Sequence, residues 1–101
     1  QNALEKQIFQ TLLLHKKFFQ SCLVKYYKAK SGAVTNGESV FDLSIDVTGA
    51  IEKAAITKTD IDDPEYLQCL KVVFSRIRFK NLPIKEPLHA VFPLSVELPQ
   101  Q

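Results

Sequence analysis

The stretch that decides the fold is residues 38–50, which read Glu-Ser-Val-Phe-Asp-Leu-Ser-Ile-Asp-Val-Thr-Gly-Ala. Apolar and polar side chains alternate along it, with a period of two that is typical of a half-buried β-strand. The apolar positions are Phe41, Leu43, Ile45 and Val47. We therefore predict a strand over residues 38–48, with one apolar face and one polar face that carries Asp42, Ser44 and Asp46.

A second strand is expected directly after it. Thr48-Gly49 is a turn signal, and so short a link joins two strands as an antiparallel hairpin. The second strand is predicted over residues 50–58. Its apolar anchors, Ile51 and Ile56, have an odd spacing that breaks the alternation, so we expect a β-bulge near Lys53-Ala54.

Upstream of the hairpin, apolar side chains recur at spacings of three and four, which indicates one stripe of an amphipathic helix. The stripe consists of Leu4, Ile8, Leu12, His15, Phe19, Cys22 and Tyr26. It predicts a single helix over residues 4–30, followed by a loop at Gly32 and Asn36-Gly37. The lysines of this helix are interpreted as a solvated face, with contact to acidic lipid or peptidoglycan as the alternative.

Downstream, Asp62-Asp63-Pro64-Glu65 is a helix start, because Asp caps free amides, Pro suits the first turn and acids match the positive end of the helix dipole. It predicts a helix over residues 63–78. A last strand is predicted over residues 88–98 from six alternating apolar residues, Leu88, Ala90, Phe92, Leu94, Val96 and Leu98. Pro93 lies on the opposite face and donates no ladder hydrogen bond, so this strand should lie at an edge of the sheet.

The element order is therefore α-β-β-α-β, an α+β fold. The last strand can pair antiparallel with the first, which gives a three-stranded antiparallel sheet of order 2-1-3 with two helices on one face. Residues 1–101 contain 46% apolar and 24% charged residues, which fits one globular domain. The chain begins at Gln1 and not at Met, so we interpret it as a piece of a longer protein.

Composition and spacing argue against several classes of function. A net charge of +2 is too small to favour a nucleic-acid partner, and no apolar run is long enough to span a membrane. The two histidines and two cysteines match no metal-binding spacing, and Asp60, Asp62 and Asp63 are explained by helix capping rather than by calcium. We expect no catalytic residue, no metal ion and no cofactor. Spacing alone leaves Cys22 and Cys69 open between two buried thiols and one disulfide.

The residues from Asn36 to Ile51 resemble the pattern of TonB C-terminal domains, in which alternating apolar residues lie between two glycines. The helix that ends in Arg76-Ile77-Arg78-Phe79 is similar to the second helix of that family. The AgmX/PglI C-terminal subfamily of gliding-motility proteins is a closer likeness, through His15, Cys22, Cys69 and Phe92-Pro93. The chain departs from the family pattern at Lys85-Glu86-Pro87, where a glycine pair is usual, and after Phe79, where a proline is usual.

This resemblance implies a periplasmic domain at the C-terminal end of a protein anchored in the inner membrane of a Gram-negative bacterium, with contact to the membrane only through an upstream anchor. It favours a Cys22–Cys69 disulfide, because the periplasm is oxidising. It also implies a non-catalytic coupling module for motility or energy transduction, whose last strand captures a periplasmic segment of an outer-membrane or envelope protein by strand addition. The expected partner-binding residues are His89, Ala90, Val91, Phe92, Pro93, Leu94 and Ser95. The alternative is a structural domain that forms homodimers by edge pairing or contacts peptidoglycan.

Overall fold

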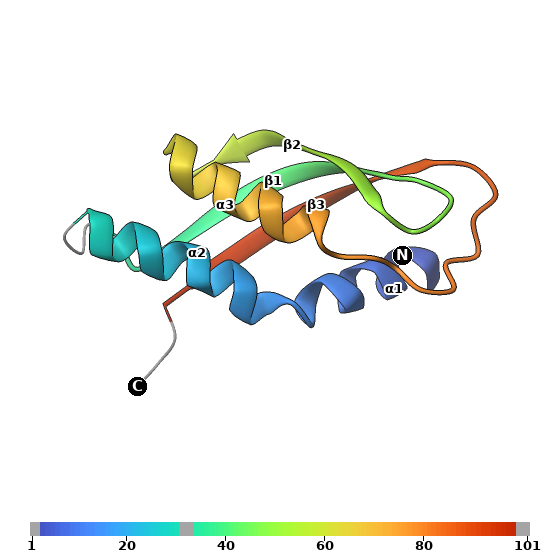
Figure 1. Cartoon of the computed structure of the whole chain (residues 1–101), viewed down its shortest axis with the longest axis horizontal. Helices are drawn as coiled ribbons and strands as arrows, with labels where there is room; N and C mark the ends of the chain where they lie inside the picture. The colour runs from blue at the N-terminus through green and yellow to red at the C-terminus, as the bar shows by residue number, and fades with distance from the viewer. Residues whose placement is uncertain (1–2, 31–33, 99–101) are drawn as a thin grey trace.

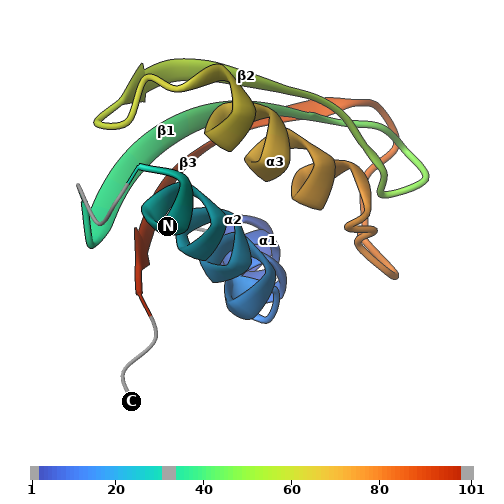
Figure 2. The same cartoon turned by 60° about the vertical axis from the view of Figure 1, so that its left-hand side comes forward.

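The computed structural model describes residues 3–30 and 34–98, which form a curved sheet with its helices on the concave face (Figures 1 and 2). The elements are α1 (Ala3–Leu13), α2 (Lys16–Ala29), β1 (Asn36–Ile45), β2 (Ile51–Thr59), α3 (Pro64–Ser75) and β3 (Leu88–Glu97). The sheet is antiparallel and has the order β2-β1-β3. The predicted α+β fold and its strand order are confirmed.

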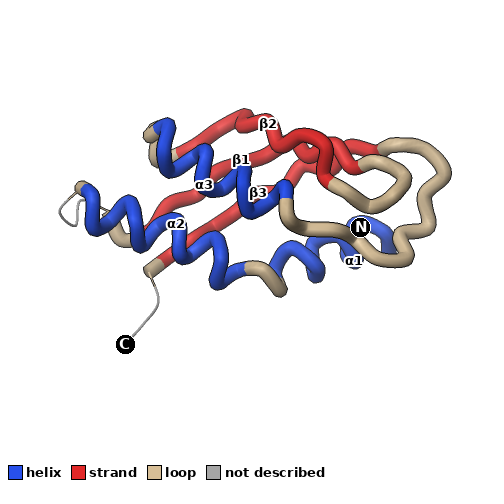
Figure 3. The backbone as a smooth tube through the Cα atoms, in the orientation of Figure 1, coloured by secondary structure: helices blue, strands red, loops and turns tan. Residues whose placement is uncertain are grey.

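The prediction of one helix over residues 4–30 is wrong, because the helix is interrupted at Leu14 and His15, between α1 and α2 (Figure 3). In a continuous helix the His15 amide would donate to the Thr11 carbonyl. Here that amide donates to the Leu12 carbonyl at 3.0 Å, and the His15 ring Nδ1 takes its place at 3.0 Å from the Thr11 oxygen. The tightened turn leaves Leu14 outside the buried stripe.

β1 is the central strand, and it starts and ends earlier than predicted. Asn36-Gly37, expected in a loop, are its first two residues, and Gly32 lies outside the described residues. The strand ends at Ile45, so Val47 is exposed and lies in the turn instead of the core. The cause is Asp46, whose Oδ1 accepts hydrogen bonds from the Thr48 hydroxyl and amide and from the Ala50 amide. These bonds, above all the one from the Thr48 side chain, lower the pKa of Asp46.

The end of the hairpin is closed by the segment that follows α3. Gly49 has φ +87°, and a Cβ there would lie 2.0 Å from the Phe79 carbonyl oxygen, so the position requires glycine. The Phe79 amide donates to the Gly49 carbonyl at 2.8 Å, and Ala50 forms a β-bridge with Arg78. This pairing takes residues 76–79 out of the helix, which explains why α3 ends at Ser75 and not at Arg78 as predicted.

β2 is irregular near both of its ends. Its register with β1 skips Thr57, between Ile56 and Lys58, and skips Glu52, between Ile51 and Lys53. The expected bulge is therefore displaced, because Lys53 and Ala54 are both paired with β1. Two extra residues in one strand increase its twist, and the sheet curves over the helices (Figure 2).

The core is organised around the ring of Phe74 in α3. Its centroid lies 4.9 Å from that of Phe19 in α2, 4.7 Å from that of Phe41 in β1 and 6.4 Å from that of Phe92 in β3. Phe9 in α1 extends the cluster, with its ring 5.5 Å from Phe92. The Phe74 side chain thus contacts α2 and two of the three strands.

We expect Phe74→Ala to lower the free energy of unfolding by about 3–5 kcal/mol, because the change opens a cavity in a fully buried cluster. That is a large share of the roughly 5–15 kcal/mol that holds a domain together. Urea unfolding followed by circular dichroism measures the effect. Phe18→Ala is the matched control, since the Phe18 ring is half exposed and its loss should cost at most about 0.5 kcal/mol. Equal losses in the two variants would contradict the central role of Phe74.

Candidate functional site

The sheet has two edges, and they differ in regularity. β2 carries two bulges together with Lys53 and Lys58, which are devices that discourage pairing with another strand. β3 pairs with β1 over ten consecutive residue pairs, from Asn36↔Glu97 to Ile45↔Leu88, in one unbroken register. The described part of the chain therefore offers one regular edge for strand addition, and it belongs to β3.

The register determines which backbone groups face this free edge. The Leu98 amide donates to the Thr35 carbonyl at 3.0 Å, so Leu98 and Thr35 form a hydrogen-bonded pair. In an antiparallel ladder such pairs alternate with pairs that share no backbone hydrogen bond, so every second residue of β3 before Leu98 bonds to β1. The residues whose amide and carbonyl groups point away from β1 are His89, Val91, Pro93, Ser95 and Glu97. The Thr57 hydroxyl bonds the Val40 carbonyl from the β2 side, which agrees, because Val40 lies opposite Pro93.

Two features limit this edge. Pro93 has no amide hydrogen, so it removes one outward donor from the middle of the strand. At the C-terminal end, the Gln20 side chain of α2 donates to the Glu97 carbonyl at 3.2 Å. The outward donors that remain along the strand are the amides of His89, Val91, Ser95 and Glu97, because Gln20 occupies the carbonyl of Glu97 and not its amide.

The structure divides the seven predicted partner-binding residues into two groups. His89, Val91, Pro93 and Ser95 have exposed side chains and outward backbone groups. Ala90, Phe92 and Leu94 bond to β1, and the side chains of Phe92 and Leu94 are buried in the core. The second group can support an added strand only indirectly, by fixing the first.

Sequence reasoning missed a polar cluster on the outer face of the sheet. His89 lies opposite Ser44, and its Nδ1 is 3.4 Å from the Ser44 Oγ and 3.5 Å from the Asp42 Oδ1. The alternation placed all three residues on the polar face, but only the strand register brings them together. In a catalytic triad the acid and the serine contact opposite nitrogens of the ring. Here both contact the same nitrogen, so the arrangement does not activate the serine.

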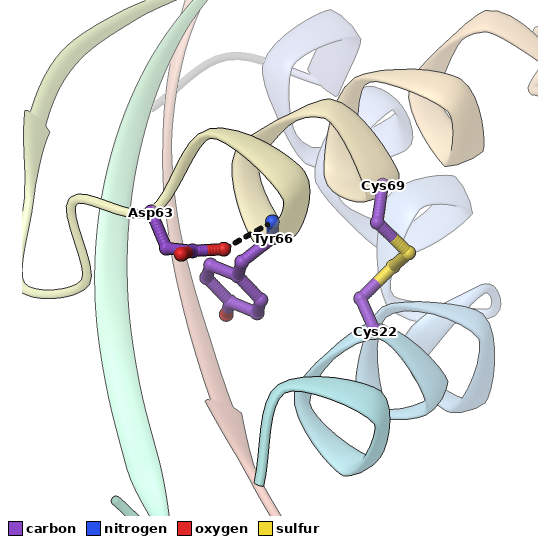
Figure 4. Close-up of a disulfide and its surroundings, with 4 residues drawn as sticks. All are labelled: Cys22, Asp63, Tyr66 and Cys69. Carbon is purple, nitrogen blue, oxygen red and sulfur yellow. Dashed lines mark hydrogen bonds between the residues drawn. A yellow bond between two sulfur atoms is a disulfide. The ribbon is translucent and has the colours of Figure 1, made fainter. Parts of the chain in front are cut away.

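Cys22 in α2 and Cys69 in α3 are joined in a disulfide with an S–S distance of 2.09 Å and Cα atoms 5.8 Å apart (Figure 4). A groove of about 510 Å³ runs between the two helices and is lined by both cysteines. Its apolar lining includes Phe18, Val72 and Val73, and Lys25 and Arg76 also line it.

The predicted cap of α3 lies at one end of this groove. The Asp63 Oδ2 accepts a hydrogen bond from the Tyr66 amide at 3.0 Å, as Figure 4 shows, and the Lys30 ammonium lies 3.8 Å from Asp63 Oδ1. Asp60 has another role, because its carboxylate accepts from the Glu38 amide and ties the end of β2 to β1. Within residues 3–30 and 34–98, no three His, Cys, Asp or Glu side chains are grouped so that they could hold a metal ion. In the same residues, no helix is both long and apolar enough to cross a membrane.

The disulfide closes a loop of 47 residues, so its removal should lower the free energy of unfolding by about 4 kcal/mol, chiefly because the unfolded chain gains freedom. We expect the urea midpoint to fall when the oxidised protein is treated with a reductant, and Cys22→Ala with Cys69→Ala to reproduce that fall. The double variant is also the control, since a reductant should not affect it. A midpoint that the reductant leaves unchanged in the native chain would contradict the prediction.

Tyr66 makes stability sensitive to alkaline pH. Its side chain is only 3% exposed and packs against the Tyr26 ring at 5.6 Å. Burial raises the pKa of Tyr66 from 10.0 to about 12. Because the folded protein holds this proton more tightly than the unfolded chain, the contribution to stability is complete below pH 10 and is lost as pH rises towards 12.

We therefore expect the free energy of unfolding to fall between pH 10 and 12 by about 2–3 kcal/mol more in the native chain than in Tyr66→Phe. Urea unfolding across this pH range measures the difference, and tyrosinate absorbance should show one of the three tyrosines titrating last. Parallel pH profiles for the two proteins would show that Tyr66 does not carry the effect.

Comparison of the chain with protein-family models, curated proteins and solved structures finds no match. The likeness to TonB C-terminal domains thus rests on the sequence pattern alone.

Proposed function

We propose that this domain is a non-catalytic protein-interaction module that captures an extended segment of a partner protein along the free edge of β3. The observation that carries the proposal is the contrast between the two edges. β3 is regular over ten pairs, whereas β2 is interrupted twice. Strand addition draws affinity from backbone hydrogen bonds, so a regular edge is the feature it needs.

The added segment would bond to the outward groups of His89, Val91 and Ser95 and pass Pro93 with one bond missing. Its side chains would alternate between the two faces of the sheet. On the outer face they would meet the exposed side chains of Val91 and Pro93, which form an apolar step on this edge. A partner segment with apolar residues at alternate positions fits this edge.

The proposed setting is the periplasm of a Gram-negative bacterium, where the domain would couple an inner-membrane motility or energy-transducing complex to an outer-membrane or envelope protein. The TonB-like pattern supports this setting. The Cys22–Cys69 disulfide supports an oxidising compartment, because disulfides persist in such compartments. The same bond would hold α2 against α3 while the partner pulls on β3.

The edge can be tested by adding and removing single backbone donors. Val91→Pro should weaken binding about tenfold, because it removes one outward amide at a cost of roughly 1–1.5 kcal/mol. Pro93→Val should strengthen binding by a similar factor, because it supplies the missing donor. Ala54→Pro is the matched control. Ala54 pairs with Leu43, whose backbone groups face β3, so the Ala54 amide points to the free edge of β2.

The probe is a set of peptides selected from a random library on the oxidised domain, with dissociation constants measured by calorimetry for the three variants. Binding that is weakened by Ala54→Pro and unaffected by Val91→Pro would move the site to β2. Concentration-dependent dimerisation that Val91→Pro abolishes, with no peptide bound, would replace the proposal by self-assembly through the same edge.

A further inference from the structure

Charge is divided unevenly along the chain. Residues 1–30 contain six lysines and one acidic residue, Glu5, whereas residues 31–101 contain seven basic and ten acidic residues. α2 has four lysines, Lys16, Lys17, Lys25 and Lys28, and no acidic residue, and Lys30 follows it directly. The α1–α2 segment is therefore the cationic side of a molecule whose net charge is only +2.

The break between α1 and α2 also produces an exposed apolar corner. Leu13 is 59% exposed, Leu14 80% and Phe18 50%. These are three of the six exposed large hydrophobic side chains in the described residues, and they lie within six positions of one another. In Figure 1 the junction of α1 and α2 lies at the lower edge of the helical layer, on the side away from the sheet.

The apolar corner continues into the cationic face. Leu14, Phe18, Ser21, Lys25 and Lys28 follow one another at spacings of four and three, and all five are exposed. Phe18, Ser21, Lys25 and Lys28 therefore lie along one stripe of α2, and Leu14 precedes them at the break. Lys17 extends the cationic margin to the corner itself, with its ammonium 5.5 Å from the centre of the Phe18 ring. One face thus has an apolar end and a cationic end.

We propose that this face binds the surface of an anionic lipid bilayer. Leu13, Leu14 and Phe18 enter the boundary between headgroups and acyl chains, while Lys17, Lys25 and Lys28 contact anionic headgroups. A helix with lysines on its polar face and large apolar side chains beside them has the chemistry of an interfacial helix. This face shares no residue with the β3 edge, so bilayer binding can be tested independently of partner capture at β3.

The charge pattern favours a bilayer over other occupants. A second copy of the chain would bring two lysine-rich faces together, which repel each other. A nucleic acid would satisfy the lysines but would offer no apolar phase to Leu13 and Leu14. An anionic bilayer supplies both components, and a protruding corner can enter it without any matching cavity.

Co-sedimentation with vesicles tests this directly. The oxidised domain is mixed with vesicles of phosphatidylcholine alone or of phosphatidylcholine with phosphatidylglycerol, at low and at physiological salt. We expect binding to the anionic vesicles, weakened by salt. Leu14→Gln with Phe18→Gln should lower the partition coefficient at least about tenfold. Lys25→Gln with Lys28→Gln should lower it roughly 25-fold, about fivefold for each lysine.

Two control variants match these changes elsewhere on the surface. Val47→Gln alters an apolar side chain of similar exposure in the hairpin turn, and Lys53→Gln with Lys58→Gln removes two charges from β2. Both should bind like the native chain. Phe18→Trp keeps a large aromatic side chain at this position and adds a fluorescent reporter. Its tryptophan signal comes from this position alone, because the chain has no tryptophan. Its fluorescence should shift to shorter wavelength on anionic vesicles and be quenched by brominated lipid, whereas Val47→Trp should not respond.

Several results would overturn the proposal. They are no binding to anionic vesicles at low salt, equal binding to neutral vesicles, equal losses in the control variants, or a Phe18→Trp spectrum that vesicles leave unchanged. Binding that is weakened by Lys25→Gln with Lys28→Gln but unchanged by Leu14→Gln with Phe18→Gln would show adsorption without insertion. That result would refute the docking face. Sedimentation that shows a dimer sensitive to the same two changes would assign the corner to a second copy.

Discussion

The structure depends on one packing constraint, which is that the ring of Phe74 joins α2 and two strands of the sheet at the centre of the core. Phe74 contacts Phe19 in α2, Phe41 in the central strand and Phe92 in the edge strand. Phe9 in α1 extends the same cluster through its contact with Phe92. Cys69 lies five positions before Phe74 in α3, and Cys22 lies three positions after Phe19 in α2. The disulfide therefore holds together the same two helices that the ring joins, at an adjacent point.

A three-stranded sheet always has two edges, and the sequence treats them differently. β2 is twisted by bulges and carries lysines, which discourages pairing at that side. β3 cannot be protected in this way, because its inner face supplies Phe92, Leu94 and Val96 to the core and a shifted register would expose them. Pro93 is the compatible solution, since it removes an outward donor and leaves the ladder to β1 intact. Under the proposed function, the same proline would favour a partner that tolerates the missing bond and would discourage indiscriminate pairing.

Periodicity predicted the fold because the strand and helix stripes coincide with real buried faces. It did not predict the break at Leu14, because His15 lies on the apolar stripe and only its ring bond to the Thr11 carbonyl reveals the interruption. The end of α3 was missed for a similar reason, since it depends on the contact of Phe79 with Gly49, thirty positions earlier. The edge position of β3 followed from Pro93, but the identity of its outward amides needed the register. The cluster of Asp42, Ser44 and His89 likewise could not be predicted without the register that sets which residues of β1 and β3 lie opposite one another.

The location of the disulfide can be understood from the route that a load would take. A partner strand on β3 would load ten backbone pairs to β1 together if pulled along the strand, which is the strongest direction for a ladder. From β1 the load reaches α3 through Phe41 and Phe74, and there the open groove separates the exposed parts of α2 and α3. Non-covalent packing could open along such a groove, and the Cys22–Cys69 bond crosses it. If α2 also rests on a membrane, the bond lies between the two surfaces that would be pulled apart, which is where a covalent link resists separation most effectively.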